Sequence, residues 1–406
     1  MAGSEHSPES WERPSQESWD PDELLTEERQ RNPYPWFAEM RAQAPVHYDE
    51  SRDAYDIFSY DETVEMVTDW ERFSRHKTSF MGGSLMDRDP PEHTDLRGMA
   101  ADYFMPGAIR EYQPRFEEMA NNLLDDALAD GAEFDFIEEI AKPLPIMIIA
   151  DMMGVPTEKM DSFRKWSKDL TSSPATLEGV QSKEKAQKRK HGAAQKLLSF
   201  FETEIQKREA NPQDDLITEM VQAEAESDLV TREQTKANCS MLLAAGNITT
   251  TTFMSNALWT YIEEDVIDDI KSGEIDLLDA NEEVLRYRSP VTSMKRRAAE
   301  DTVLGGTSIP AGKKVVSYLN AANRDPDVFE DPNEFRPERE PPKEPIPYGK
   351  GIHYCLGAPL ANMEAEIMLG NFLDRIEDAE LLVDEIEPLI STAVYGPAEL
   401  PIRVEL

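Results

Sequence analysis

Cysteine is scarce in this chain. Its 406 residues include only Cys239 and Cys355, which excludes the disulfide framework that stabilises many small secreted domains. We expect Cys239 to be a core residue, because it lies within an apolar helical pattern and a lone cysteine usually behaves as a small hydrophobe. Cys355 lies in a glycine-rich loop instead, and that position calls for a functional explanation.

Long hydrophobic runs are missing as well. The apolar stretches are short and interrupted by charge, whereas a helix that spans a bilayer needs roughly 20 apolar residues. The N-terminus has neither the basic nor the apolar segment of a secretory signal. We therefore expect a soluble, cytoplasmic protein without a membrane partner.

Positive charge is also in short supply. The chain has 42 Lys and Arg residues against 81 Asp and Glu, a formal net charge of −39. Nucleic acids and anionic membranes bind through positive charge, so both are excluded as expected partners. The acidic residues are spread along the whole length, and such a surface suits high salt, where screening weakens self-repulsion. The composition indicates a halophilic, archaeal source.

Helical periodicity dominates residues 93–287, with predicted breaks near Pro106, Gly131 and Pro156 and in the polar region 172–190. Residues 75–90 have the composition of a loop. Short β-like runs occur at 46–48, 55–58, 302–304 and 314–318, and strands are expected toward the C-terminus. We predict a mainly α fold with a smaller β region (α+β), formed by a loosely attached polar lead at 1–30 and a single domain at 31–406.

Cys355 carries the strongest functional signal. Its loop runs Tyr348-Gly349-Lys350-Gly351-Ile352-His353-Tyr354-Cys355-Leu356-Gly357 and leads into a predicted helix. Backbone N–H groups at a helix start favour a thiolate, and glycines leave room for a flat macrocycle whose iron the thiolate could bind. Taken alone, the cysteine would more often be a buried hydrophobe, and the loop could equally bind a phosphate.

This loop resembles the cysteine-ligand signature of the cytochrome P450 family, Phe-Gly-x-Gly-x-His-x-Cys-x-Gly. Tyr348 replaces the phenylalanine, and the matching positions are Gly349, Gly351, His353, Cys355 and Gly357. The resemblance implies the P450 fold and a haem b cofactor with Cys355 as the axial thiolate ligand of its iron. It also implies that Gly349 and Gly357 belong to the haem-binding loop and that His353 reaches a haem propionate.

Two further segments resemble haem-contacting parts of the family. Residues 89–106 resemble its haem-contacting helix, in which His93 and Arg97 are four apart and therefore share a face that suits a carboxylate. Arg296 and Arg297 lie where members supply another propionate-binding arginine, with Arg296 at the matching position and Arg297 as the alternative. Without the resemblance, each of these residues would be interpreted as a solvated surface group.

A charged triad is also implied. Glu283 and Arg286 are three apart on one helical face and resemble the family's Glu-x-x-Arg pair, while Arg339 matches the last arginine of its meander motif. We assign these residues a structural role beneath the cysteine loop. Such a buried triad can specify geometry even where its net stabilisation is small.

The segment 241–252 resembles the helix that crosses the oxygen-binding face of the haem. Its family pattern is Ala/Gly-Gly-x-Asp/Glu-Thr, and Ala245, Gly246 and Thr249 match while Ile248 replaces the acid. Threonine hydroxyls can bond back to carbonyls four residues earlier and loosen the helix. We assign Gly246, Asn247 and Thr249 to catalysis. Either Thr249 with ordered water delivers protons, or Asn247 or the substrate assists, or the enzyme uses peroxide directly.

The resemblance implies a haem-thiolate monooxygenase that inserts one oxygen atom of O2 into a small or medium apolar substrate. Because the chain has no flavin or iron–sulfur motif, electrons must come from a separate ferredoxin and ferredoxin reductase, with Lys343 and Lys350 as candidate contacts. A peroxide-dependent hydroxylase of the same fold and a non-catalytic haem sensor or carrier are the alternatives. We expect a monomer. The expected apolar pocket residues are Met81, Leu85, Leu242, Ala245, Val291, Met294 and Val394.

Overall fold

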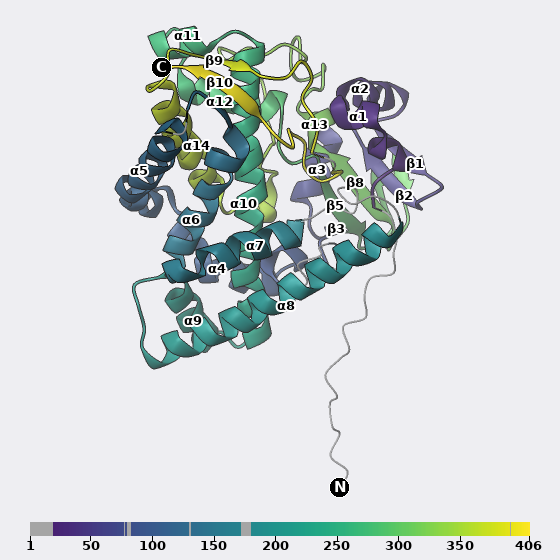
Figure 1. The fold of residues 1–406 in the computed structure, drawn as a ribbon. Coiled ribbons are helices and arrows are strands. Elements are labelled where there is room, and N and C mark those ends of the chain that lie inside the picture. The colour runs from purple at the N-terminus through teal and green to yellow at the C-terminus, as the bar shows by residue number, and fades with distance from the viewer. Residues whose placement is uncertain (1–18, 77, 79–82, 130, 172–179, 390) are drawn as a thin grey trace.

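The computed structural model describes residues 19–76, 78, 83–129, 131–171, 180–389 and 391–406. Helices fill the left and centre of Figure 1, and a β-sheet with two short helices stands at the right. The helices are α1 (Glu27–Arg31), α2 (Tyr34–Gln43), α3 (Tyr60–Thr68), α4 (Glu92–Ala101), α5 (Pro106–Ala129), α6 (Pro143–Met152), α7 (Met160–Thr171), α8 (Val180–Ala210), α9 (Leu216–Glu226), α10 (Arg232–Glu263), α11 (Ile267–Ser272), α12 (Leu277–Tyr287), α13 (Leu319–Ala322) and α14 (Ala358–Leu373).

The strands form three sheets. A five-stranded sheet has the order β1-β2-β8-β5-β3, a three-stranded sheet the order β4-β10-β9, and β6 pairs with β7. Their bounds are β1 (Val46–Asp49), β2 (Ala54–Ile57), β3 (Phe73–Ser74), β4 (Glu133–Asp135), β5 (Ser293–Ala298), β6 (Thr302–Leu304), β7 (Thr307–Ile309), β8 (Lys314–Tyr318), β9 (Asp378–Leu381) and β10 (Pro401–Glu405). The mainly α fold with a smaller β region is confirmed.

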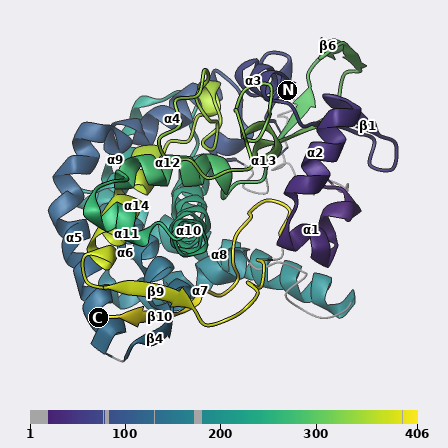
Figure 2. The same ribbon diagram turned by 90° about the horizontal axis from the view of Figure 1, so that it is seen from above.

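The long helix α10 runs through the middle of the helical part, and Figure 2 looks almost along its axis. Thr231 and Gln234 form a capping box at its start, which satisfies N–H groups that the helix itself leaves unpaired. Buried residues cover most of its surface, including Cys239, which is fully buried against Met220 as expected of a core residue. The middle of α10 is therefore held in place by packing and offers a rigid surface to a ligand beside it.

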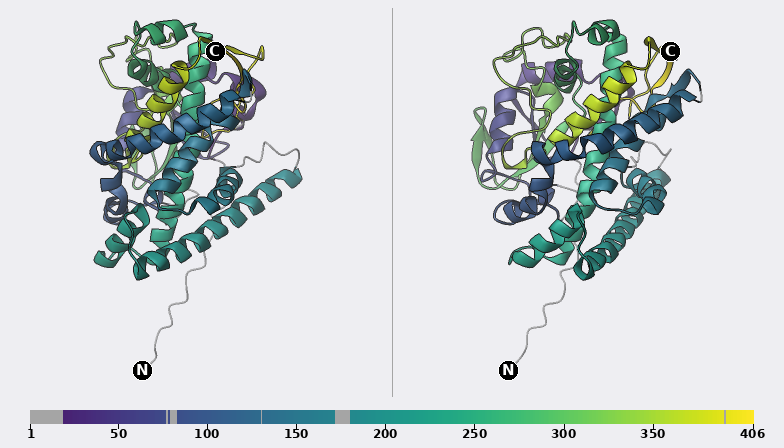
Figure 3. Two further views of the ribbon diagram at one scale, coloured as in Figure 1. Left: turned by 60° about the vertical axis from the view of Figure 1, so that its left-hand side comes forward. Right: turned by 90° about the vertical axis from the view of Figure 1, so that its left-hand side faces the viewer.

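One predicted helix break is wrong in part, and another is confirmed. Residues 180–190, expected to interrupt the helical region, belong to α8, the long helix at the bottom of both views in Figure 3. Their Lys, Gln and Glu are good helix formers, although their polar sequence has no apolar period to reveal it. Residues 172–179 lie outside the described ranges. The predicted break near Pro106 is confirmed: α4 ends at Ala101, Met105 is extended, and Pro106 begins α5, at a position where the missing N–H of proline costs nothing.

The predicted lead at 1–30 is too long. Residues 1–18 lie outside the described ranges, but from Trp19 onward the chain is attached to the fold. Leu24 is almost fully buried and packs in one core cluster with Trp36. Lys295 of β5 forms an ion pair with Asp20, at 2.8 Å. None of the helices in the described ranges combines the length and the hydropathy that crossing a membrane requires.

Candidate active site

The cysteine loop is a tight turn that ends at the start of α14. Gly349 and Gly351 have φ angles of +70° and +73°, the left-handed region that favours glycine. A Cβ atom on Gly349 would clash with the Met294 side chain. The Cys355 N–H donates to the Tyr348 carbonyl at 3.1 Å, which closes the turn. The glycines therefore fix where the sulfur lies.

The Cys355 side chain is partly exposed, on the wall of a cavity, and the protein atoms that surround the thiol raise its pKa by desolvation. Hydrogen bonds from the backbone N–H groups of Gly357 and Ala358, and the charge of Arg97, act in the opposite direction. The helix start thus favours the thiolate as predicted, but less strongly than burial opposes it. A bound metal cation would supply the missing stabilisation, because coordination deprotonates a thiol.

Cys355 lies on the wall of an apolar cavity. Ala245, Gly246 and Thr249 of α10 line it as well. Five of the expected pocket residues are among its lining residues: Leu85, Leu242, Ala245, Val291 and Met294. Val394 is not among them, but it forms a β-bridge with Val291. Met81 lies outside the described residues.

Cationic and imidazole side chains gather on this cavity. Arg75, Arg97, Arg296 and His353 line it, and the ring of His93 lies 4.3 Å from that of His353. Burial, with Arg97 second, lowers the pKa of His93 to about 4. Burial followed by the charge of Arg296 also lowers the pKa of His353.

Three nitrogen atoms in this cluster lack partners. His93 Nε2, His353 Nε2 and Arg296 Nε are buried and have no hydrogen-bond partner among the described residues. Buried polar atoms are normally satisfied, so this set of donors fits an anionic group such as a carboxylate. His93 and Arg97 both come from α4, and Arg97 also donates to the Tyr354 carbonyl at 2.9 Å.

The two adjacent arginines point to opposite faces of the strand β5. Arg296 is 1% exposed and lines the cavity. Arg297 instead places its guanidinium 5.1 Å from the ring of Trp19, because successive side chains of a strand point to opposite faces. Arg75 was missed by the sequence interpretation. It follows β3, whose Ser74 pairs with Arg297, and this pairing cannot be recognised from a segment that reads as a loop.

The middle of α10 presents only part of the predicted catalytic set to the cavity. Gly246 and Thr249 line it, whereas Asn247 is buried and is not among the lining residues. The Thr249 hydroxyl donates to the Ala245 carbonyl at 2.9 Å, which is the expected back-bond. The helix nevertheless continues without a break. A Cβ atom on Gly246 would meet nothing within 4 Å, so this residue leaves open space beside the helix.

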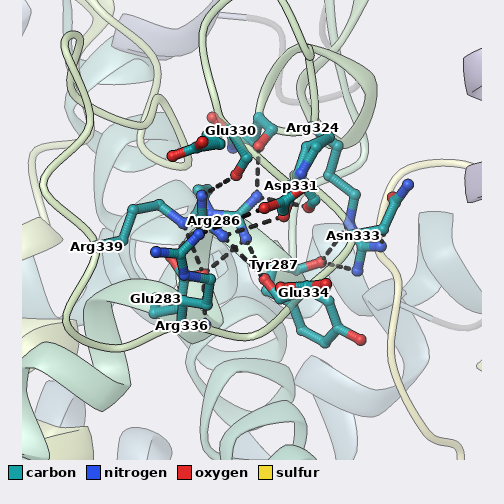
Figure 4. A network of polar contacts seen from close by, with 12 residues as sticks. Glu283, Arg286, Tyr287, Arg324, Glu330, Asp331, Asn333, Glu334, Arg336 and Arg339 are labelled. Carbon is teal, nitrogen blue, oxygen red and sulfur yellow. Dashed lines mark hydrogen bonds and ion pairs between the residues drawn. The ribbon is translucent and has the colours of Figure 1, made fainter.

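The predicted triad is present in a larger polar network (Figure 4). Arg286 donates to both carboxylate oxygens of Glu283, at 2.7 and 2.8 Å, and Arg339 donates to one of them at 3.1 Å. Arg286 also donates to the Asn323 carbonyl at 3.0 Å, and the Asn323 side chain accepts from Ile346 N–H at 2.8 Å. The triad therefore supports the coil that leads into the cysteine loop.

The haem that the resemblance implies fits the residues present. The cavity has apolar walls, one cysteine thiol, and a cluster of arginine and histidine side chains in which Arg296, His93 and His353 have unpartnered nitrogen atoms that suit propionate carboxylates. Gly357 lines the cavity, and a Cβ atom there would meet nothing within 4 Å. Gly349 is not a lining residue; its left-handed backbone shapes the loop.

Comparisons with known proteins agree with this arrangement. The sequence profile described as Cytochrome P450 matches residues 16–269 and 268–378. Cytochrome P450 109 of Bacillus spizizenii is 35% identical over 386 residues, which cover 94% of each chain. Erythromycin C-12 hydroxylase of Saccharopolyspora erythraea is 30% identical over 385 residues, which cover 90% of this chain and 93% of that protein.

A solved structure shares the fold. CYP109E1 from Bacillus megaterium, in complex with testosterone, has a TM-score of 0.87 and 37% sequence identity, and the match covers 94% of this chain and 100% of that one. The family match, the relatives and the shared fold all indicate the same protein family. The chain belongs to the cytochrome P450 family and is a haem-thiolate monooxygenase, an enzyme whose haem b has an axial cysteine thiolate.

Proposed function

We propose that Cys355 is the axial ligand and that the enzyme hydroxylates an apolar substrate of about steroid size with electrons from a separate ferredoxin. The observation that carries the proposal is that Cys355 shares one cavity with the arginine group and the middle of α10. Cys239 is fully buried in the core, so it is no competing ligand. The bound haem supplies dioxygen activation and oxygen-atom transfer.

The chain's own residues hold and shield this chemistry. Arg296, His93, Arg97 and His353 are proposed to bind the propionates, because their nitrogen atoms are donors in a buried setting. Arg75 joins them on the same cavity. We propose that Thr249 and Gly246 receive dioxygen and water beside α10, where space is open.

The residues that line the cavity support an apolar substrate. Leu85, Leu242, Val291 and Met294 present apolar surface, which favours apolar molecules through burial. CYP109E1, with 37% identity, has been crystallised with testosterone and with corticosterone. A steroid or another compact apolar molecule is therefore the proposed substrate.

The electron donor is proposed to dock beside the cysteine loop. Lys350 belongs to this loop and Lys343 precedes it in the sequence by five residues. Lys343 has the acidic neighbour Asp61, and Lys350 has Glu344. The net charge of −39 would repel an acidic ferredoxin. Since salt screens this repulsion, we expect the electron-transfer rate to rise with salt over some range; a rate that falls steadily from low salt would contradict this docking.

The test is a titration of the ferric enzyme with testosterone, followed by turnover. We expect a spin-state shift in the haem spectrum that saturates with steroid, and a hydroxylated product when ferredoxin, its reductase and NAD(P)H are supplied. A charged control of similar size, such as a steroid sulfate, should bind more weakly, because the cavity would have to desolvate its charge. Failure of every apolar steroid to shift the spectrum would contradict the substrate proposal.

Peroxide use is the second candidate function. Ile248 at the position of the family's acid favours it, because peroxide brings the protons that an acid would otherwise deliver. Supplying hydrogen peroxide in place of ferredoxin separates the two functions. Product formed faster with peroxide than with the ferredoxin system would favour the peroxide-dependent hydroxylase.

A further inference from the structure

Positive charge is concentrated in one short segment of this acidic chain, away from the active site. Residues 183–196, near the start of α8, contain six Lys or Arg and one Glu, although acidic residues outnumber basic ones by 81 to 42 in the whole chain. Lys188, Arg189 and Lys196 of this segment are exposed. We call residues 183–196 the basic end of α8, and none of them lines the haem cavity.

The cations of the basic end lack the carboxylate partners that other surface cations have. Within the described part of the chain, Lys188, Arg189 and Lys196 form no ion pair. Arg403, by contrast, is equally on the surface and pairs with Glu133 at 2.7 Å. Like charges three and four residues apart on a helix repel each other. An anionic partner would therefore stabilise this end of the helix.

The basic end extends beyond the part of α8 that packs on the core. Ala193, Leu197 and Phe201 recur every four residues, are buried, and belong to the main hydrophobic cluster. On the N-terminal side of Ala193 the same spacing is continued by Arg189 and Lys185. The stripe that anchors α8 is thus apolar in the body of the helix and charged at its start, which suits a contact with an anionic surface and not with the core.

A surface of opposite charge lies at the other end of the molecule. Residues 263–282, which include α11, contain nine Asp or Glu and one Lys. We call this segment the acidic face; its exposed acids are Glu263, Glu264, Asp265, Asp268, Glu274, Asp276, Asp279 and Glu282. Figure 1 has α11 at the top and α8 at the bottom, and both views of Figure 3 agree. The basic end and the acidic face therefore cannot meet within one molecule.

We propose that the basic end of α8 binds the acidic face of a second copy of this chain. A second copy is the favoured occupant because it presents the complementary charge on a surface that its own basic end cannot reach. Each copy uses two different surfaces, so the contact is head to tail and adds further copies instead of closing a symmetric dimer. The inference goes beyond the proposed function and does not depend on it, and it replaces the monomer expected from the sequence.

Two electrostatic effects of opposite sign determine the salt range of this contact. The net charge of −39 makes whole molecules repel each other, over about 30 Å at 0.01 M salt but only about 10 Å at 0.1 M. The ion pairs of the contact itself persist at about 0.1 M and are weakened at about 1 M, where the screening length is about 3 Å. Association should therefore be strongest at intermediate salt.

The first test is sedimentation equilibrium of the unmodified holoenzyme over a range of protein and NaCl concentrations. At about 0.1 M NaCl we expect the weight-average mass to rise with protein concentration and to pass that of a dimer without a plateau. At about 0.01 M and about 1 M NaCl the mass should be lower. A monomer under all conditions would overturn the proposal, and so would association that strengthens steadily up to 1 M, which indicates an apolar contact.

The second test reverses each surface separately. Lys188→Glu with Arg189→Glu changes the basic end, and Asp268→Lys with Glu274→Lys changes the acidic face. Each pair should weaken self-association about tenfold, as loss of two or more exposed ion pairs allows. Arg110→Glu, an exposed arginine of α5, is the control of equal charge change per residue and should leave the association unchanged.

A mixture of the two reversed variants tests the head-to-tail arrangement. Only one unmodified basic end and one unmodified acidic face remain in each pair of molecules, so the mixture should form a complex of one copy of each and stop there. A mixture that stays monomeric, or an Arg110→Glu variant that weakens association as much as the reversed pairs do, would overturn the proposal.

Other occupants of the basic end are separated by the same variants. Phosphatidylglycerol vesicles and an acidic ferredoxin are each offered to the holoenzyme at about 0.1 M NaCl, where the screening length is about 10 Å. We expect no binding to either that Lys188→Glu with Arg189→Glu removes. A monomeric enzyme whose binding to vesicles or to ferredoxin is lost in that variant would overturn the assignment to a second copy. A thiolate-type haem spectrum and oxygenated product would still support the proposed function in that case.

Discussion

At the residue scale, the contrast between Arg296 and Arg297 shows how neighbouring identical side chains acquire different roles. Arg296 is buried on the cavity, whereas Arg297 reaches the Gly312 carbonyl at 3.1 Å and the ring of Trp19. The sequence offered both as propionate ligands. Only their positions in β5 separate them, because strand side chains alternate between faces.

Replacing Arg296 by Ala should weaken haem binding. A hydrogen bond to a charged group contributes about 1.5–3 kcal/mol, which corresponds to a haem dissociation rate at least about tenfold faster. Transfer of haem to an apoglobin acceptor measures that rate. Arg297→Ala is the matched control and should release haem at the unmodified rate; equal effects of the two substitutions would refute the assignment.

Replacing Ile248 by Asp should increase the product formed per electron consumed. An isoleucine cannot carry a proton, whereas a carboxyl at this position of α10 can. Product and consumed NAD(P)H are counted in the same reaction, with Ile248→Asn as a control of similar polarity that has no acid. A yield that stays unchanged or falls in Ile248→Asp would count against slow proton delivery in this enzyme.

Much of the candidate site was predictable because its residues lie in short local motifs. Cys355, His93, Arg97 and Thr249 were assigned from such patterns, and all except His93 line the cavity, while the His93 ring contacts that of His353 edge to face. Arg75 and Glu364, which also line the cavity, were not assigned. Their positions depend on strand pairing and on burial between helices, which are long-range properties that no local pattern contains.

At the element scale, the triad network holds irregular backbone segments in place, not helices or strands. Arg286 binds the carbonyls of Asn323, Pro332 and Glu334 at 2.9–3.0 Å, so one fully buried guanidinium organises several irregular segments (Figure 4). Irregular backbone lacks regular partners and needs such donors. The network thereby connects α12 to the segment before the cysteine loop.

Replacing Arg286 by Met should destabilise the folded enzyme by about 3–5 kcal/mol, because it leaves the buried Glu283 carboxylate without its main partner. Denaturant unfolding of the holoenzyme measures the loss. Arg336→Met is the control: within the described part of the chain its side chain forms ion pairs only with the exposed Asp331 and Glu338, and such pairs contribute about 1 kcal/mol or less. A loss no larger than that of the control would contradict a structural role for the triad.

Element boundaries were harder to predict than element types. The strand patterns at 46–48 and 314–318 are present as β1 and β8. The strand β5 was not recognised, because its Lys295, Arg296 and Arg297 read as a solvated patch. Tertiary pairing with β8 and β3 determines it instead, as is common for β-structure.

At the scale of the whole molecule, charge is the dominant feature. The net charge of −39 is carried by a fold that the chain shares with bacterial relatives at 30–35% identity. Self-repulsion acts against the compact state and is relieved by screening. The halophilic origin inferred from composition stays a prediction.

The holoenzyme should therefore become more stable as salt is added. The screening length falls from about 10 Å at 0.1 M to about 3 Å at 1 M, so the thermal unfolding midpoint should rise over this range in NaCl and equally in KCl. Scanning calorimetry or loss of the haem absorption measures it. A midpoint that falls or does not move would show that acidic repulsion does not limit stability.

The central claim is that the Cys355 sulfur binds the haem iron, and the carbon monoxide difference spectrum of the reduced enzyme tests it most directly. The account predicts a strongly red-shifted main band in the unmodified protein, which requires a thiolate opposite the gas ligand, and its loss in Cys355→Ser but not in Cys239→Ser. A purified, haem-supplied protein without that band, or a Cys355→Ser variant that keeps it, would contradict the account.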